Sequence, residues 1–353
     1  MKRTKIDEPM SEQVQDKVKN AQVKKEKPKL DGNIEMMIST GSTLLDLAIS
    51  GGRVRGGGIP AGIMVEIFGP SSTGKTVLLT EIAGNVQNQN GSVMFHDPEA
   101  RLNAQFAQLF GFELNSAEYS RPNLVPEVFQ AIRAWEPEDP KAINGIFADS
   151  LAALSTDMEM GSEEGDKMGG RRAKEFSQEL RRTCRMLANK NYLLVCSNQI
   201  RDTMATVGPK TTSPGGKAIN FYSSLRLKTD FAYQDAKMYK EKTHAGKVVK
   251  KVVGINIDVE VFKSTVWKPL GTAPVTIIFD YGIDDVRQNL QYVKKYTDST
   301  TYVLGEDKLD KGLDKSIAII EDEDLEDVLR EEVIDLWEVI EEKFKSDRKP
   351  KKR

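Results

Sequence analysis

Gly69-Pro-Ser-Ser-Thr-Gly-Lys-Thr76 is the stretch of this 353-residue chain that decides its fold. It has the pattern G-x-x-x-x-G-K-[ST], whose glycines let successive backbone N–H groups turn inward around a triphosphate. In such a loop Lys75 can reach the β- and γ-phosphates, and the Thr76 hydroxyl can ligate Mg²⁺. The pattern therefore predicts that ATP and Mg²⁺ are bound by Gly69, Pro70, Ser71, Ser72, Thr73, Gly74, Lys75, Thr76 and Val77.

The residues on either side have the periodicities that a phosphate-binding loop requires. Residues 63–68 form a short apolar run, which is typical of a buried strand, and residues 76–86 carry apolar side chains at helical spacing. Phosphates held between them would lie at a helix N-terminus, where the helix dipole favours anions. A strand, a Gly-rich loop and a helix in this order distinguish the motif from a chance turn.

The composition excludes several classes of protein. The net charge is −2, so any binding of nucleic acid would have to come from local basic patches. Cys184 and Cys196 are too few for a disulfide framework, and His96 and His244 make a histidine-based metal site unexpected. Because the chain shows no apolar run of about 18 residues and no apolar segment after its first residues, we expect a cytoplasmic protein.

Composition and periodicity divide the chain into four regions. We expect a polar, basic arm over 1–33, an α/β core over 34–290, a small carboxy-terminal region over 291–345 and a basic tail over 346–353. Within the carboxy-terminal region, residues 321–344 read as one amphipathic, acidic helix. The tail is either a flexible end or a weak electrostatic binding site for DNA phosphates.

Strands and helices alternate after the Gly-rich loop. We expect strands at 92–96, 145–149 and 192–198, with helices at 103–110, 126–135 and 170–189 between them. This alternation predicts a mostly parallel, twisted sheet with helices on both faces. Residues 247–263 alternate with period two around Gly254, which predicts an antiparallel hairpin or meander, and 273–279 read as a further strand.

Three polar residues follow predicted strands and suit ATP chemistry. Asp149 closes a hydrophobic strand, where an acid can hold the Mg²⁺ shell. Glu99 is compatible with a general base that activates water, and equally with a surface glutamate beside a turn proline. The Gln199 side chain can hydrogen-bond a γ-phosphate and so couple its presence to the loop that follows. On its own, this glutamine also fits a polar strand end.

In this order, the motifs resemble those of the RecA recombinase family. The resemblance covers roughly residues 35–285 and includes Ile38-Ser-Thr-Gly-Ser42, the phosphate-binding loop, Phe95-His-Asp-Pro-Glu99, Ala148-Asp-Ser-Leu-Ala-Ala-Leu154, Asn198-Gln-Ile-Arg201 and Pro214-Gly-Gly-Lys-Ala-Ile-Asn-Phe-Tyr222. It implies a RecA-like core with an antiparallel extension. It also implies that ATP lies between the subunits of a helical filament.

The resemblance implies roles for individual residues. Glu99 would be the general base, Lys75 would bind phosphates, Gln199 would sense the γ-phosphate, and Thr76 and Asp149 would hold the metal. Lys263 resembles a lysine that a neighbouring subunit inserts against ATP, where it neutralises transition-state charge. Two positions depart from the family: Thr265 replaces a second such lysine, with Lys268 as an alternative, and Asn103 replaces an adenine-contacting acid.

Two Gly-rich loops, 159–170 and 201–216, lie where the family binds DNA. From composition alone they read as solvated loops; the resemblance favours sequence-independent DNA binding through phosphate contacts and apolar wedges. The wedges would be Met204 and Val207. The remaining contacts would come from Arg171, Arg172, Lys174, Arg201, Lys210, Gly215, Gly216 and Lys217.

The leading hypothesis is an ATP-dependent recombinase. It would form filaments on single-stranded DNA and catalyse homologous pairing and strand exchange with double-stranded DNA, in recombination and repair. Two alternatives remain: a RecA-like accessory or regulatory ATPase that acts on a protein partner, and a hexameric helicase motor. DNA-stimulated hydrolysis with ATP-dependent filaments favours the first hypothesis, whereas a closed hexamer with directional unwinding favours the helicase.

Overall fold

The computed structural model describes residues 36–155, 169–202, 211–212 and 216–348. The expected amino-terminal arm, most of the two expected DNA-binding loops and the last residues of the basic tail lie outside these ranges. Among the described residues, no helix combines the length and the apolar character needed to span a membrane.

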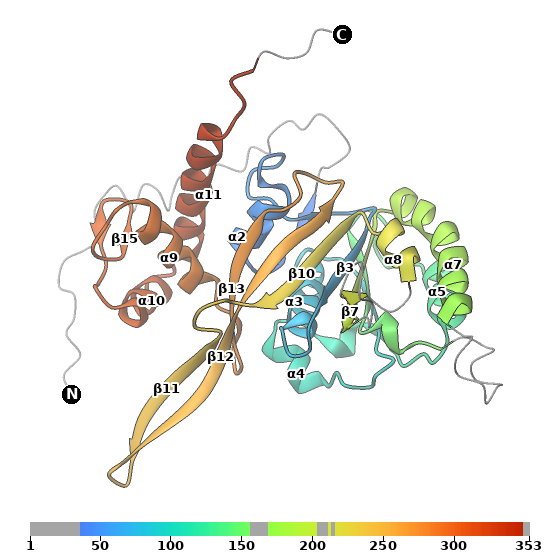
Figure 1. Cartoon of the computed structure of the whole chain (residues 1–353), viewed down its shortest axis with the longest axis horizontal. Helices are drawn as coiled ribbons and strands as arrows, with labels where there is room; N and C mark the ends of the chain where they lie inside the picture. The colour runs from blue at the N-terminus through green and yellow to red at the C-terminus, as the bar shows by residue number, and fades with distance from the viewer. Residues whose placement is uncertain (1–35, 156–168, 203–210, 213–215, 349–353) are drawn as a thin grey trace.

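A ten-stranded sheet forms the centre of the molecule (Figure 1). Six neighbouring strands are parallel: β10 (Leu225–Phe231), β3 (Met64–Gly69), β7 (Tyr192–Gln199), β6 (Asn144–Ala148), β4 (Val93–His96) and β5 (Glu118–Ser120). Antiparallel strands extend the sheet beyond β10, namely β12 (Lys247–Ser264), β13 (Thr272–Ile278), β14 (Gly282–Ile283) and β11 (Lys237–His244), which pairs with β12. The predicted α/β class, mostly parallel sheet and antiparallel extension are confirmed.

Helices cover both faces of the sheet because the buried strands alternate their side chains between the two faces. On one face, Val65 and Ile67 of β3 belong to the core cluster that includes α3 (Lys75–Asn88) and α4 (Ala104–Leu109). On the other face, Met64 packs in the cluster formed with α5 (Val125–Ala134), α7 (Gly169–Lys190) and α8 (Gly216–Tyr222). The nucleotide-binding motif therefore lies at the carboxyl end of a central strand, supported from both sides.

Shorter elements complete the described chain. Two-stranded pairs are β1 (Met37–Ile38) with β2 (Ile59–Pro60), β8 (Arg201–Asp202) with β9 (Thr211–Thr212), and β15 (Val303–Leu304) with β16 (Asp307–Lys308). The short helical turns are α2 (Thr43–Asp46), which continues as a π-turn over Leu47–Gly51, and 3₁₀ turns at Leu114–Ser116 and Leu151–Ala153.

The antiparallel hairpin has a different turn from the one we predicted. Residues 247–264 form one long strand, β12, and Gly254 lies within it, where a Cβ would come 2.4 Å from the Ile277 carbonyl oxygen. The turn lies at Ala245-Gly246, where both residues have positive φ (48° and 76°). Gly254 therefore marks a close approach of two strands, and β11, which composition alone had not suggested, supplies the other arm.

The acidic helix expected over 321–344 is present over most of that segment, but it begins only at Glu326. The segment contains the end of α10 (Leu313–Asp322) and all of α11 (Glu326–Lys343). Asp324 between them has a left-handed φ of 53°, a conformation that aspartate tolerates better than most residues and that interrupts a helix. The two helices pack with α9 (Asp285–Tyr296) beside the core.

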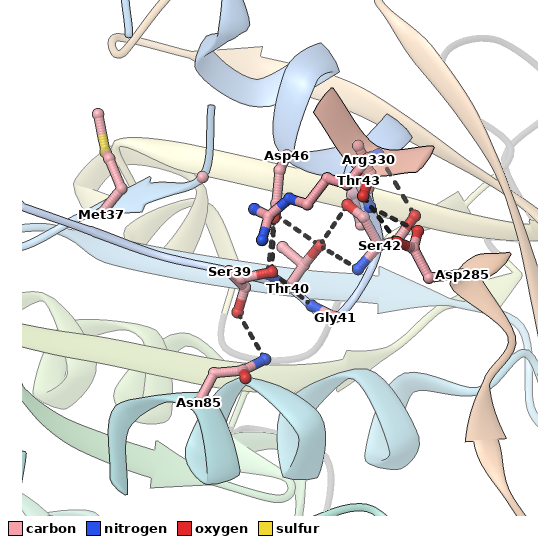
Figure 2. Close-up of polar contacts among 12 residues, drawn as sticks. Met37, Ser39, Thr40, Gly41, Ser42, Thr43, Asp46, Asn85, Asp285 and Arg330 are labelled. Carbon is pink, nitrogen blue, oxygen red and sulfur yellow. Dashed lines mark hydrogen bonds and ion pairs between the residues drawn. The ribbon is translucent and has the colours of Figure 1, made fainter. Parts of the chain in front are cut away.

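Buried polar contacts hold this carboxy-terminal region to the first described residues of the core (Figure 2). Asp285 of α9 accepts hydrogen bonds from the Thr43 amide at 2.7 Å and the Thr43 hydroxyl at 2.6 Å. Asp46 accepts from the Ser39 hydroxyl at 2.6 Å, and Arg330 of α11 lies 3.9 Å away. Burial raises the pKa of Asp46 to about 6, although Arg330 and the hydroxyl donors act in the opposite direction.

Candidate active site

The phosphate-binding loop contains two positions that favour glycine. Gly74 has a φ of 72° at the N-cap of α3, and a Cβ there would come 2.2 Å from Cδ1 of Ile277 on β13. A Cβ on Gly69 would come 2.2 Å from the Thr229 carbonyl oxygen on β10. The Thr73 and Thr229 hydroxyls are 2.7 Å apart and tie the loop to the same strand. The loop is thus a preformed backbone cradle, which fits a phosphate chain.

Lys75 lies over this cradle. Its Nζ donates hydrogen bonds to the carbonyl oxygens of Gly69 at 3.2 Å and Pro70 at 2.5 Å, and the residue is 9% exposed. Burial lowers the lysine pKa, while Asp149 and Glu99 act to raise it. An anionic phosphate beside Nζ would favour the charged form further.

Thr76, Asp149 and Ser197 form an oxygen-rich cluster next to the cradle. The Thr76 hydroxyl donates to Asp149 Oδ2 at 2.6 Å, and the Ser197 hydroxyl donates to Asp149 Oδ1. No group of three or more His, Cys, Asp or Glu side chains suited to a metal occurs among the described residues. One carboxylate and two hydroxyls suit Mg²⁺, which keeps several waters and usually takes its remaining ligands from substrate phosphates.

Glu99 lies beside Ser150, the residue that follows Asp149. The Ser150 hydroxyl donates to Glu99 Oε1 at 3.4 Å, and Arg101 forms an ion pair with Oε2 at 2.6 Å. The Glu99 side chain is 18% exposed and that of Arg101 is 71% exposed. The carboxylate is therefore held from both sides at the edge of the site while remaining accessible to water.

These side chains surround one cavity of about 330 Å³, a size typical of small-ligand sites. Gln199, at the end of β7, lines it, and the following amide, that of Ile200, donates to the Gly69 carbonyl at 3.3 Å. Apolar side chains from β12 and the β13 end close another side, namely Ile255, Ile277 and Phe279. The structure thus brings Ser71, Ser72, Gly74, Lys75, Thr76, Val77, Glu99, Asp149 and Gln199 together.

Two predicted residues lie away from this cavity. Asn103 is the N-cap of α4, where its side chain accepts a hydrogen bond from the Phe106 amide at 2.8 Å, and it does not line the cavity. Lys263 lies on β12, and its Nζ donates to the carbonyl oxygens of Asn220 at 2.8 Å and Phe221 at 3.2 Å. It therefore holds the last turn of α8 in this chain, and action on ATP would have to involve a neighbouring copy.

The residues expected to contact DNA begin or follow the two expected loops. Arg171, Arg172 and Lys174 lie in the first turns of α7, with Lys174 exposed. Arg201 lies in β8, two residues after Gln199, while Gly216 and Lys217 begin α8, which packs against α7. The other predicted contacts lie outside the described residues, namely Met204, Val207, Lys210 and Gly215.

Sequence reasoning missed several residues of the site. Ser197 carried one usable signal: β6 and β7 are parallel neighbours with Ala148 opposite Cys196, so the next residues, Asp149 and Ser197, meet at one edge of the sheet. Arg101 offered no such signal.

A buried ion pair beside the site was missed as well. Arg226 of β10 bonds Glu66 of β3 within the sheet, and both residues are nearly inaccessible (4% and 0% exposed). The Asn198 side chain donates to the same glutamate at 2.9 Å. A glutamate inside an otherwise apolar strand was the available signal, because a buried charge requires partners.

The fold and the site together define a P-loop nucleotide-binding protein with a mostly parallel sheet. The family model of the RecA N-terminal domain matches residues 5–284, and the chain belongs to the RecA family. This membership supports an ATP-dependent recombinase role and ATPase activity.

Curated relatives agree with this assignment. Protein RecA of Acholeplasma laidlawii is 31% identical over 299 residues, which covers 83% of this chain and 84% of that protein. Protein RecA of Thermus thermophilus is 34% identical over 251 residues, covering 71% and 69%. Protein RecA of Thermus aquaticus is 34% identical over 262 residues, covering 74% and 71%.

Proposed function

We propose that this chain is a DNA-dependent ATPase that forms filaments on single-stranded DNA, hydrolyses ATP to ADP and phosphate, and exchanges strands with homologous double-stranded DNA. The cavity at the phosphate-binding loop carries the proposal. It gathers Lys75, Thr76, Glu99, Asp149 and Gln199 from separate segments of the chain around one space large enough for a triphosphate.

Each of these side chains takes a role that its position supports. Lys75 and the loop amides would hold the phosphates, and Thr76 with Asp149 would hold the cation. A bound Mg²⁺ would polarise the phosphates and neutralise charge that develops on them. Glu99 accepts a proton from the attacking water, because its carboxylate lies on the cavity wall within reach of solvent.

Gln199 links the nucleotide to DNA in this proposal. It lies in the cavity, and the chain continues from it through Arg201 into the second expected loop. A γ-phosphate that holds Gln199 would therefore favour one conformation of that loop. Loss of the γ-phosphate on hydrolysis would release the loop from this conformation. The phosphate contacts would come from the basic side chains at the starts of α7 and α8, so binding would not depend on base sequence.

The test compares ATP hydrolysis with and without single-stranded DNA for the unmodified chain and for Glu99→Gln. We expect strong stimulation by DNA in the unmodified chain and a loss of about 10²-fold or more in the variant, because the general base is removed. DNA binding by Glu99→Gln should be retained. Glu136→Gln is the matched control, since Glu136 is exposed and does not line the cavity.

Two results would overturn the proposal. Hydrolysis that is indifferent to single-stranded DNA would remove the DNA-dependent step and favour an accessory ATPase that acts on a protein partner. Normal hydrolysis by Glu99→Gln would show that another group activates the water.

A further inference from the structure

The cavity at the phosphate-binding loop contains a second cationic side chain, Arg101, to which no role has been assigned. Among the described residues that line this cavity, Lys75 and Arg101 are the cationic ones. Lys75 is nearly buried and bonds two loop carbonyls, whereas the Arg101 side chain is 71% exposed and pairs with Glu99. A guanidinium at this place is suited to a phosphate, because its planar fork matches two phosphate oxygens.

The backbone around Arg101 is anchored on both sides. Before it, Ala100 has a left-handed φ of 52°, a conformation that is uncommon for residues other than glycine and that turns the chain after Glu99. After it, the Leu102 amide donates to the carboxylate of Asp97 at 2.8 Å, and both of these residues are buried. A change of partner by Arg101 therefore requires movement of its side chain alone.

Both oxygens of the Glu99 carboxylate are engaged. Oε1 accepts a hydrogen bond from the hydroxyl of Ser150, which is 2% exposed, and Oε2 pairs with the Arg101 guanidinium at 2.6 Å. The serine is held within the fold, whereas an ion pair with an exposed partner contributes little stability and is readily exchanged. Of the two partners, Arg101 is therefore the one that can leave.

The same guanidinium lies close to the expected position of the γ-phosphate. A general base acts on its water at hydrogen-bond distance, so a working Glu99 is separated from the γ-phosphate by one water. Glu99 also acts to raise the pKa of Lys75, which places its carboxylate near the phosphate-binding lysine. A guanidinium nitrogen 2.6 Å from Glu99 is therefore within a short side-chain movement of the phosphate.

We propose that Arg101 is a further catalytic residue, which pairs with Glu99 when no triphosphate is bound and with the γ-phosphate of bound ATP. The exchange brings a second positive charge to the place where negative charge develops during phosphoryl transfer. It also leaves Oε2 of Glu99 open to the attacking water. The water oxygen then bonds to the γ-phosphorus, its proton goes to Oε2, and the bond from phosphorus to the ADP oxygen breaks.

This inference rests on the proposed function, and its test begins with binding. The measurement compares a fluorescent, non-hydrolysable ATP analogue with the matching fluorescent ADP, in the presence of Mg²⁺ and without DNA. For Arg101→Gln we expect the affinity for the analogue to fall by about 10-fold, the effect of one charge-assisted contact, and the affinity for ADP to change by less than about 2-fold. Arg101→Lys keeps the charge without the planar fork and should recover part of the loss.

Glu99→Gln tests the exchange of partners. It removes the carboxylate that competes for Arg101, so the variant should bind the analogue about 2- to 5-fold more tightly than the unmodified chain, with the affinity for ADP unchanged. The double variant Glu99→Gln, Arg101→Gln should lose this gain. In hydrolysis on single-stranded DNA, Arg101→Gln should lower kcat by about 10²-fold or more.

Arg121→Gln is the matched control. Arg121 follows β5 at the same edge of the sheet, is exposed and does not line the cavity, so the variant should leave both affinities unchanged. Because the Arg101 and Arg121 side chains are both exposed, each variant should unfold at the same temperature as the unmodified chain.

Three outcomes would overturn the inference: an unchanged affinity for the analogue in Arg101→Gln, an equal loss of affinity for ADP, or tighter analogue binding that persists in the double variant. The second would make Arg101 part of the wall for any nucleotide, and the third would assign the gain to the lost charge of Glu99. Stimulation of hydrolysis by single-stranded DNA is read separately in the unmodified chain. Since the binding measurements contain no DNA, failure of the proposed function is distinguishable from failure of the Arg101 assignment.

Discussion

The Thr76 hydroxyl and the Asp149 carboxylate, 73 residues apart in sequence, are joined by a 2.6 Å hydrogen bond at the centre of the candidate active site. The bond connects the first turn of α3 to the residue that follows β6, and Ser197, near the end of β7, bonds the other carboxylate oxygen. Three separate segments therefore converge on one cation-sized cluster of oxygens, held in place by the parallel register of β6 and β7.

Thr76→Ala should lower ATP hydrolysis by about 10²-fold and raise the Mg²⁺ concentration needed for half-maximal rate, because it removes a proposed ligand and the partner of Asp149. The measurement is a Mg²⁺ titration of the steady-state rate. Thr76→Ser keeps the hydroxyl and should behave like the unmodified chain. An unchanged Mg²⁺ requirement in Thr76→Ala would exclude Thr76 from the metal shell.

Glu81 should make the fold less stable as pH rises. Burial raises its pKa from 4.5 to about 7, partly opposed by the hydrogen bond from the Ile283 amide at 2.9 Å. A group whose pKa is raised by folding contributes stability that is complete below the unfolded pKa and is lost as pH rises through the folded pKa. The stability that Glu81 contributes should therefore be lost between about pH 4.5 and pH 7.

Glu81→Gln removes this titration while keeping an oxygen that can accept from Ile283. Relative to the unmodified chain, the variant should gain about 2 kcal/mol in free energy of unfolding between about pH 5 and about pH 8. Urea denaturation at the two pH values measures this difference. An equal effect of the variant at both values would show that Glu81 titrates normally in the folded chain.

The nucleotide-binding part of the fold could be predicted because its signals are local. The G-x-x-x-x-G-K-[ST] pattern, the apolar run before it and the helical spacing after it lie within one short segment, and each describes the same supersecondary unit. Asp149 was predictable for a related reason: a carboxylate at the end of a buried strand requires a partner. In the structure, the hydroxyls of Thr76 and Ser197 are the hydrogen-bond partners of this carboxylate.

The remaining features depend on which distant residues meet. The sequence around Gly254 does not show that the Ile277 carbonyl lies against this residue. A glycine required by close packing therefore cannot be distinguished by sequence from a glycine in a turn. Asp324 interrupts the acidic helix through its backbone conformation, while the apolar periodicity continues across it. Arg101 forms an ion pair with Glu99, which is two residues before it in the sequence. The segment has no regular periodicity, so the direction of the Arg101 side chain cannot be inferred from its spacing.

Asp285→Ala should destabilise the chain by about 3 kcal/mol. Burial raises the pKa of this carboxyl, and hydrogen bonds from Thr43 oppose the shift. Removing it leaves the buried Thr43 amide and hydroxyl without their carboxylate acceptor (Figure 2). It also removes the 2.8 Å hydrogen bond that the Asn289 side chain donates to this carboxylate. Thermal unfolding measures the effect.

Asp314→Ala is the matched control for this variant. Asp314 also bonds a residue of α9, but its side chain is 88% exposed, so the variant should change stability by about 0.5 kcal/mol or less. Equal destabilisation by the two variants would contradict the importance of the buried contact with Thr43.

Lys263 offers a test of catalysis across a subunit interface. In this chain its Nζ holds the carbonyl oxygens of Asn220 and Phe221, away from the cavity that contains Glu99. If Lys263 acts on the ATP of a neighbouring copy, Lys263→Gln and Glu99→Gln should each be inactive alone, yet regain activity when mixed in equal amounts. In a mixed filament some interfaces combine an intact Glu99 with an intact Lys263, roughly one in four by random assortment.

Recovery of hydrolysis towards that fraction on single-stranded DNA would place the lysine in the neighbour's site, because a residue that acted only within its own chain could not be supplied by another subunit. Absence of any recovery, with both variants still assembling, would leave Lys263 as a cap for α8.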